Sequence, residues 1–254
     1  PRSYAKSTMH RTEDEEMAVV LQQLTGMAYN KYFYPSISGV AQSYNFYPIS
    51  HLKAEEGVTY IALGLGKIVM EGGRTIRFCP KYPQFFPQFS VLDDILENSQ
   101  KYFYALKLDQ SMGDEKAIST SNEDLTLEKL DLSDATDHPV VRFLSSTYYA
   151  QDNRIRDSFS NKRFPVLTFA NILKYNSFPL AKLLEEVTKI GSKWMGASVE
   201  VEFAVNLPED EKLKPQFSLL QIRPMGRYKQ NMGVKIGKKE IKEAFGYSTL
   251  SLGN

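Results

Sequence analysis

Two carboxylates stand at alternate positions in a segment that reads as a β-strand. From Val199 to Asn206 apolar and polar residues alternate, and side chains two residues apart in a strand point to the same face. Glu200 and Glu202 therefore share one face of the predicted strand. Carboxylate oxygens placed in this way could bind a hard cation such as Mg²⁺.

A second predicted strand follows and brings a carboxamide and a guanidinium. Strict alternation within it places four side chains on one face, namely Phe217, Leu219, Gln221 and Arg223. The polar connection between the two strands predicts a hairpin. If Glu202 lies opposite Gln221, antiparallel pairing puts Glu200 opposite Arg223, because paired positions keep a constant sum.

The predicted patch of Glu200, Glu202, Gln221 and Arg223 has two interpretations. One is a magnesium nucleotide site, in which a carboxylate and the carboxamide oxygen bind Mg²⁺ while Arg223 neutralises phosphate charge. The other is a cross-strand ion pair between Glu200 and Arg223 on an exposed sheet face, with no ligand. The alternation of residues is compatible with both.

These strands would belong to a sheet at the centre of an α+β fold. Apolar runs rich in β-branched and aromatic residues predict further strands at 17–24, 38–44, 58–63 and 102–108. Leu180–Met195 predicts the clearest helix, with an inward stripe that reaches Ile190 and Trp194 and with Gly196 placed to end it. A second helix is expected from Ser90, where the sequence resembles a capping box.

Two segments are expected to lie outside this sheet and its helices. Residues 109–137 are rich in Ser, Asp and Glu and poor in large apolar side chains, which favours an exposed arm or insertion. Residues 226–254 carry several lysines among acidic and apolar residues, which favours a solvated linker or tail.

Composition excludes several classes of protein. The 254 residues are 42% hydrophobic, enough to fill the core of a folded, soluble protein. A net charge of +1 supplies no overall field for nucleic acid or an anionic membrane. The single cysteine, Cys79, excludes an intramolecular disulfide and a cysteine-rich zinc site. Because no apolar run reaches the length of a membrane span and the N-terminus lacks a secretion signal, a cytoplasmic protein is expected.

Motifs for other chemistries fail on inspection. The run Gly64-Leu65-Gly66-Lys67 suggests a P-loop, but Ile61 stands where its first glycine would be and Ile68 where its hydroxyl ligand would be. Val69 replaces the third glycine of a dinucleotide fingerprint. The three histidines lie far apart in sequence and are interpreted as surface or structural residues.

The paired strands resemble a known family. The order Glu200-Val201-Glu202-Phe203, then Leu220-Gln221-Ile222-Arg223-Pro224, resembles the motifs that close the ATP-grasp domain of phosphoenolpyruvate synthases and pyruvate phosphate dikinases. Three upstream stretches also resemble family elements, namely the hinge strand at 19–24, the Ser-Gly-Val-Ala element at 38–41 and the glycine loop at 62–66. The resemblance runs from about Met17 to Met225. It implies an ATP-grasp-like lobe with a largely antiparallel sheet and packed helices.

The resemblance implies a role for each residue of the patch. Glu202 and Gln221 would bind Mg²⁺, Arg223 would be the catalytic residue on the transferring phosphoryl group, and Glu200 would support them. In the family, this group passes from ATP to a histidine on a swivelling domain and then to pyruvate. Protein groups in such a transfer mainly position the reactants and neutralise charge.

Four further residues would bind the nucleotide by the same resemblance. Gln22 and Leu24 would border the adenine, Leu24 with its side chain or its backbone. Gly64 and Gly66 would belong to the nucleotide-binding glycine loop.

The chain departs from the family at three positions. Lys67 stands where members usually have Glu after the Gly-Leu-Gly loop. Ser43 and Tyr44 stand where dikinases usually have residues of a Phe-Thr-Arg type.

Two parts of the family enzyme have no counterpart in this sequence. One is the first ATP-grasp subdomain, with its phosphate-binding lysine and arginine, and the other is the swivelling domain with its histidine. We therefore expect residues 1–225 to be a partial ATP-grasp domain, inactive alone, from an ATP-dependent dikinase that supplies both parts. A rival hypothesis is a nucleotide-sensing or structural module that keeps the sheet but performs no phosphoryl transfer.

Overall fold

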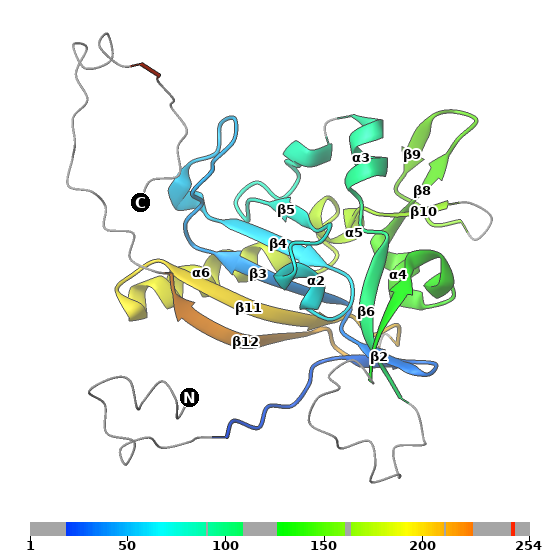
Figure 1. Cartoon of the computed structure of the whole chain (residues 1–254), viewed down its shortest axis with the longest axis horizontal. Coiled ribbons are helices and arrows are strands. Elements are labelled where there is room, and N and C mark those ends of the chain that lie inside the picture. The colour runs from blue at the N-terminus through cyan, green and yellow to red at the C-terminus, as the bar shows by residue number, and fades with distance from the viewer. Residues whose placement is uncertain are drawn as a thin grey trace.

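The structure is a computed structural model that describes residues 19–89, 91–108, 126–160, 164–210, 212–225 and 245–246. It has the expected mixed α+β architecture, and the pairings between the described strands are antiparallel. A five-stranded sheet forms the middle of the molecule (Figure 1). In spatial order its strands are β12 (Gln216–Pro224), β11 (Val199–Asn206), β3 (Ile37–Gln42), β4 (Val58–Ala62) and β5 (Ile76–Phe78).

Two smaller sheets complete the strands. The four-stranded sheet has the order β1 (Met27–Tyr29), β2 (Tyr32–Tyr34), β6 (Tyr102–Lys107) and β7 (Leu127–Asp131). The three-stranded sheet has the order β10 (Phe164–Leu167), β8 (Ser145–Tyr149) and β9 (Arg154–Arg156).

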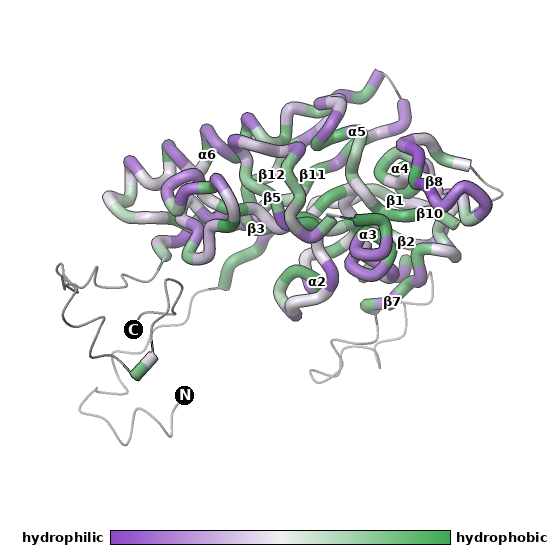
Figure 2. Tube along the Cα trace, turned by 90° about the horizontal axis from the view of Figure 1, so that it is seen from above, coloured by the Kyte–Doolittle hydropathy of each residue, from purple (hydrophilic) through white to green (hydrophobic). Residues whose placement is uncertain are grey.

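The helices are short except for α6. The described α-helices are α2 (Lys67–Met70), α3 (Leu92–Asn98), α4 (Pro139–Leu144), α5 (Ala170–Leu173) and α6 (Leu180–Met195). Three 3-10 turns accompany them, namely η2 (Ala54–Glu56), η3 (Pro87–Phe89) and η6 (Leu132–Ala135). Seen from above, α6 and α2 lie on opposite sides of the five-stranded sheet (Figure 2). The sheet is therefore covered on one face by a long helix and carries a short helix on the other.

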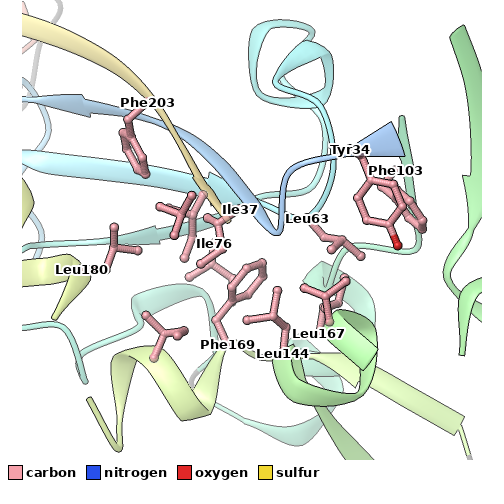
Figure 3. Packing of buried hydrophobic residues seen from close by; sticks show 14 of the residues in the cluster. Tyr34, Ile37, Leu63, Ile76, Phe103, Leu144, Leu167, Phe169, Leu180 and Phe203 are labelled. Carbon is pink, nitrogen blue, oxygen red and sulfur yellow. The ribbon is translucent and has the colours of Figure 1, made fainter. Parts of the chain in front are cut away.

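The hydrophobic core lies on the α6 side of this sheet. The alternating apolar residues of β11, which are Val199, Val201, Phe203 and Val205, are almost fully buried there. Leu180 of α6 and Phe169 beside α5 join Ile37 and Phe203 in the same cluster (Figure 3). Alternation thus places one face of β11 in the core and sets Glu200 and Glu202, which are both partly buried, on the opposite face.

Most predicted elements are confirmed. Strands β3, β4, β6, β11 and β12 lie within one or two residues of the predicted segments, and α6 spans the predicted range. Gly196 follows α6 with φ 62°, the left-handed conformation that ends many helices. Helix α3 begins at Leu92, and the Val91 N–H donates to the Asp94 carboxylate at 3.3 Å. Ser90, the predicted cap, lies outside the described residues.

The prediction of a buried strand at 17–24 is wrong for the residues that the structure describes. Residues 19–26 form no strand, and Val19, Val20 and Leu21 have exposed fractions of 81%, 85% and 93%. This segment runs alongside β12, the outer strand of the sheet (Figure 1). An apolar run becomes a strand only where a second strand offers a hydrogen-bonding ladder, and this one makes a side-chain contact with β12 instead.

Two further expectations are corrected by burial. The prediction of an exposed arm at 109–137 is wrong for part of its described residues, 126–137, because β7 pairs with β6 and Leu130, Leu132 and Ala135 are buried, although other residues there are exposed. The inward stripe of α6 ends early, since Ile190 and Trp194 have exposed fractions of 56% and 86%. Helical spacing identifies one face of a helix, but the extent of the packed surface decides how much of that face is covered.

Candidate functional site

The register of the β11–β12 hairpin confirms the predicted patch. Glu200 lies opposite Arg223 and Glu202 lies opposite Gln221. β11 also pairs with β3 on its other side, so the patch stands on a strand held by two ladders. The four polar groups therefore belong to one surface of the sheet, as the constant sum of paired positions requires.

A β-bulge corrects the predicted alternation in β12. Phe203 pairs with Leu219, so Leu220 is an extra residue between the two registers. Phe217 consequently lies on the core side, where its ring stacks on Phe203 with centroids 5.5 Å apart. The prediction that Phe217 and Leu219 share a face with Gln221 and Arg223 is wrong, because the extra residue reverses the alternation between the two sides of the bulge.

Glu200 is held from both neighbouring strands. Gln42 on β3 donates from Nε2 to Glu200 Oε2 at 2.7 Å. Arg223 on β12 donates from Nε to Glu200 Oε1 at 2.8 Å, and its Nη2 also contacts this oxygen. The hydrogen bond and charge of Glu200 raise the pKa of Arg223. Each oxygen of Glu200 thus accepts a hydrogen bond, and the residue holds Arg223 in place.

Glu202 is the less committed carboxylate of the pair. Its Oε1 lies 3.9 Å from Arg223 Nη2, longer than a hydrogen bond. Its side chain is 26% exposed, compared with 15% for Glu200. Glu202 also lines a cavity on this face of the sheet. It can therefore offer an oxygen to a cation or other ligand that enters the cavity.

This cavity has a volume of about 210 Å³ and is mainly apolar. Residues 22–25 form one wall, residues 65–66 and the last two residues of α2 form another, and β3 and β11 form the floor. Side chains of Val40, Leu65 and Met70 contribute to the lining. The cavity thus combines a mainly apolar lining with the carboxylate of Glu202, which suits a ligand with an apolar ring and a charged end.

Gln22 and Leu24, predicted as adenine contacts, both line the cavity. Gln22 Nε2 donates to the carbonyl oxygen of Leu220 at 3.2 Å. This contact joins the segment beside β12 to the bulge, and so helps to place the cavity wall.

The two predicted glycines have different positions. Gly66 lines the cavity at the start of α2, whereas Gly64 packs against β6. Gly64 has φ 87°, and a Cβ there would come within 2.7 Å of the Tyr104 carbonyl oxygen. The next residue, Leu65, donates its N–H to that same oxygen at 2.8 Å. Gly64 is thus required by a turn and a close backbone approach.

Lys67, which replaces the usual Glu, is directed along the outside of α2. Its Nζ lies 3.8 Å from Glu71 Oε1 and 5.2 Å from the centre of the Tyr104 ring. Lys67 is not among the residues that line the cavity.

Sequence reasoning missed Ser38 as a site residue. Ser38 is 3% exposed, lines the cavity, and its Oγ has no hydrogen-bond partner among the described residues. A buried hydroxyl without a partner is unfavourable unless something satisfies it. The Ser-Gly-Val-Ala resemblance marked this segment, but the burial of Ser38 beside the cavity depends on the folded sheet.

Three other findings concern the structure around this site. Within the described ranges, no group of three or more His, Cys, Asp or Glu residues is placed to hold a metal ion, and no helix is long and apolar enough to cross a membrane. A larger cavity of about 900 Å³ lies between β1, α4 and residues 207–210, 213 and 215, and none of the predicted site residues lines it. Its wall includes His138, whose Nδ1 lies 2.6 Å from the Tyr34 hydroxyl.

The other histidine within the described residues, His51, is exposed, whereas His138 is 4% exposed. This agrees with surface and structural roles for them. His10 and all but two residues of the predicted tail at 226–254 lie outside the described part of the chain.

Comparisons with known proteins agree with the resemblance. A search of curated proteins finds no match. Residues 1–244 match the family described as pyruvate phosphate dikinase, AMP/ATP-binding domain. Since the match covers most of the 254 residues, the chain belongs to the family of the AMP/ATP-binding domain of pyruvate phosphate dikinase.

Proposed function

We propose that this chain is the metal-binding part of an ATP-grasp domain and binds Mg-ATP on the face shared by β3, β11 and β12. The observation that carries the proposal is the hairpin register, which sets Glu202 and Gln221 beside Glu200 and Arg223. The family match indicates that the ligand is an adenine nucleotide, and the cavity lined by Glu202 can accommodate its base.

The cavity and the patch suit the two ends of ATP. The adenine would lie between residues 22–25 and the wall formed by Gly66 and the end of α2, against Val40 and Leu65. The triphosphate would then extend past Glu202 toward Gln221 and Arg223. This orientation keeps the apolar base away from water and leaves the phosphates beside the exposed guanidinium.

Glu202 and Gln221 fit a Mg²⁺ ion that arrives with the nucleotide. Mg²⁺ usually keeps several waters and takes one or two carboxylates together with substrate phosphates, so a closed cage of protein ligands is not required. Glu200 would be a support rather than a ligand, because both of its oxygens already accept hydrogen bonds, one from Gln42 and one from Arg223. When bound, Mg²⁺ would neutralise charge on the phosphate oxygens.

Arg223 would act on the phosphate oxygens directly. Its side chain is 50% exposed, and Glu200 holds it through Nε and Nη2. The remaining donors of the guanidinium fork can meet phosphate oxygens. In a reaction that depends on positioning and charge, this residue would stabilise the transferring phosphoryl group.

The finer activity follows from the family and belongs to this proposal. The acceptor would be a histidine on a swivelling domain, with pyruvate as the final acceptor in a cytoplasmic dikinase. A phosphate-binding ATP-grasp subdomain would be the second partner. The 254-residue chain alone would then produce no phosphoenolpyruvate from ATP and pyruvate.

Calorimetry with Mg-ATP tests the binding step. We expect the chain to bind Mg-ATP, and Glu202→Gln and Arg223→Met to weaken binding roughly 10- to 100-fold, since each removes a contact with a charged group. Removing Mg²⁺ with EDTA should reduce the effect of Glu202→Gln. Unchanged affinity in both variants would refute the site. Binding that yields no phosphohistidine even when the phosphate-binding subdomain and a histidine domain are both added would favour the module that performs no transfer.

A further inference from the structure

We propose that Gln42 is a positioning residue for Arg223 and acts through Glu200. The inference rests on the proposed function and names a further residue of the same site. Gln42 belongs to neither the patch nor the nucleotide contacts considered above. Its role follows from a row of side chains that crosses three strands.

The row is fixed by the strand ladders. Gln42 on β3 lies opposite Glu200 on β11, which in turn lies opposite Arg223 on β12. Side chains directly opposite one another on a sheet face are close enough to interact. The distances agree, at 2.7 Å from Gln42 Nε2 to Glu200 Oε2 and 2.8 Å from Arg223 Nε to Glu200 Oε1.

Gln42 limits the orientation of the Glu200 carboxylate. A terminal carboxylate torsion is broad when nothing restrains it. Here Gln42 holds one oxygen and leaves the other directed toward β12, where Arg223 binds it. Without the Gln42 donor, the carboxylate could turn and Arg223 would lose its fixed contact.

Gln42 also decides which carboxylate holds Arg223. Arg223 Nη2 lies 3.9 Å from Glu202 Oε1, so a modest movement would let Glu202 take over the guanidinium. Glu202 would then be less available to a cation. By strengthening the position of Glu200, Gln42 keeps Arg223 on Glu200 and leaves Glu202 for the metal.

Three variants and a control test this role by calorimetry and thermal unfolding. Gln42→Met keeps the size of the side chain without the donor, and Gln42→Glu places a like charge opposite Glu200. Arg223→Met reports on the proposed function itself. Gln84→Met is the matched control, because it removes an exposed glutamine that donates to the Lys174 carbonyl oxygen outside the site. Each protein is titrated with Mg-ATP and with adenosine.

We expect Gln42→Met to weaken Mg-ATP binding roughly tenfold, the lower end of what loss of an outer-shell partner does. Gln42→Glu should weaken it further, because like charges directly opposite repel. Adenosine affinity and the unfolding temperature should stay close to the unchanged protein in Gln42→Met and in the control. A general loss of structure would instead lower both affinities together.

The outcomes separate the two proposals. If the unchanged chain does not bind Mg-ATP, or Arg223→Met leaves its affinity unaltered, the proposed function fails and this inference fails with it. If Arg223→Met weakens Mg-ATP binding but Gln42→Met does not, only the positioning role is overturned. Equal losses for adenosine and Mg-ATP in Gln42→Met would also overturn it.

Discussion

Replacing Gly64 and Gly66 separately with alanine should give opposite results, although the two glycines stand two residues apart in one loop. At Gly64 the φ of 87° is unfavourable for any side chain, and a Cβ would lie 2.7 Å from the Tyr104 carbonyl oxygen and 2.9 Å from Phe103 Cδ2. The backbone conformation costs roughly 1–3 kcal/mol. Overpacking against β6 costs roughly 1–3 kcal/mol more. The structure thus predicts a destabilisation of about 2–6 kcal/mol for Gly64→Ala.

Gly66 should tolerate the same change in the absence of ligand. Its φ is −61°, and a Cβ would lie 3.9 Å from Ser38 Cβ and 4.0 Å from Ser38 Oγ, which is ordinary contact. The added methyl group would narrow the cavity where it passes between Gly66 and Ser38. Stability should change by less than about 1 kcal/mol, while adenosine and Mg-ATP should both bind more weakly.

Thermal unfolding and calorimetry on the two variants check the reasoning. For a chain of this size, about 1 kcal/mol shifts the unfolding temperature by roughly 2–4 °C, so Gly64→Ala should lower it by at least about 4 °C. Gly66→Ala should leave the temperature nearly unchanged and reduce affinity. A stable Gly64→Ala protein, or a Gly66→Ala protein with full affinity for adenosine, would refute this division of roles.

Other perturbations have equally specific outcomes. Arg223→Met should lower the unfolding temperature by less than about 4 °C in a melting experiment, because an exposed ion pair contributes at most about 1 kcal/mol; a larger drop would mean that the pair holds the hairpin. Burial lowers the pKa of His138 below 6.5, against an opposing effect of Asp137, so the unfolded chain binds its proton more readily. The stability that neutral His138 contributes should be present above pH 6.5 and be lost as the pH falls toward the lower pKa of the folded state. Urea unfolding at several pH values checks this, and the free energy of unfolding should depend less on pH in His138→Gln. Ser38→Ala should leave the free energy of unfolding unchanged or slightly higher, since Ser38 Oγ has no partner among the described residues. The same variant should weaken adenosine binding severalfold if a bound base or ribose satisfies that hydroxyl. Unchanged adenosine affinity in calorimetry would show that the hydroxyl contacts no ligand.

The hairpin of β11 and β12 shows how far local patterns carry. Alternation in Val199–Asn206 predicted the strand and the face of Glu200 and Glu202. The assumption that Glu202 lies opposite Gln221 then predicted that Glu200 lies opposite Arg223. Both are confirmed because side chains in an antiparallel ladder follow a fixed period and a fixed sum. Alternation failed to predict the face of Phe217, because the bulge at Leu220 is a local irregularity that a periodic pattern does not predict.

The segment at 19–24 and the arm at 109–137 show the opposite limit. Apolar composition predicted a buried strand in the first and polar composition predicted exposure in the second. The structure instead exposes Val19 to Leu21 and buries Leu130 and Leu132. Whether a segment is covered depends on what lies beside it in space, and composition does not contain that information.

The features of the candidate site also divide into those that local sequence patterns predict and those that depend on the folded structure. The sequence by itself determined the identity and order of Glu200, Glu202, Gln221 and Arg223, their shared strand face and the helix behind them, because alternation and helical spacing are local properties of the chain. Only the tertiary structure decided that Glu200 holds Arg223 while Glu202 borders a cavity, and that Gly64 serves packing while Gly66 lines that cavity. These distinctions depend on distances to Gln42, Ser38 and Tyr104, which folding alone brings to the site.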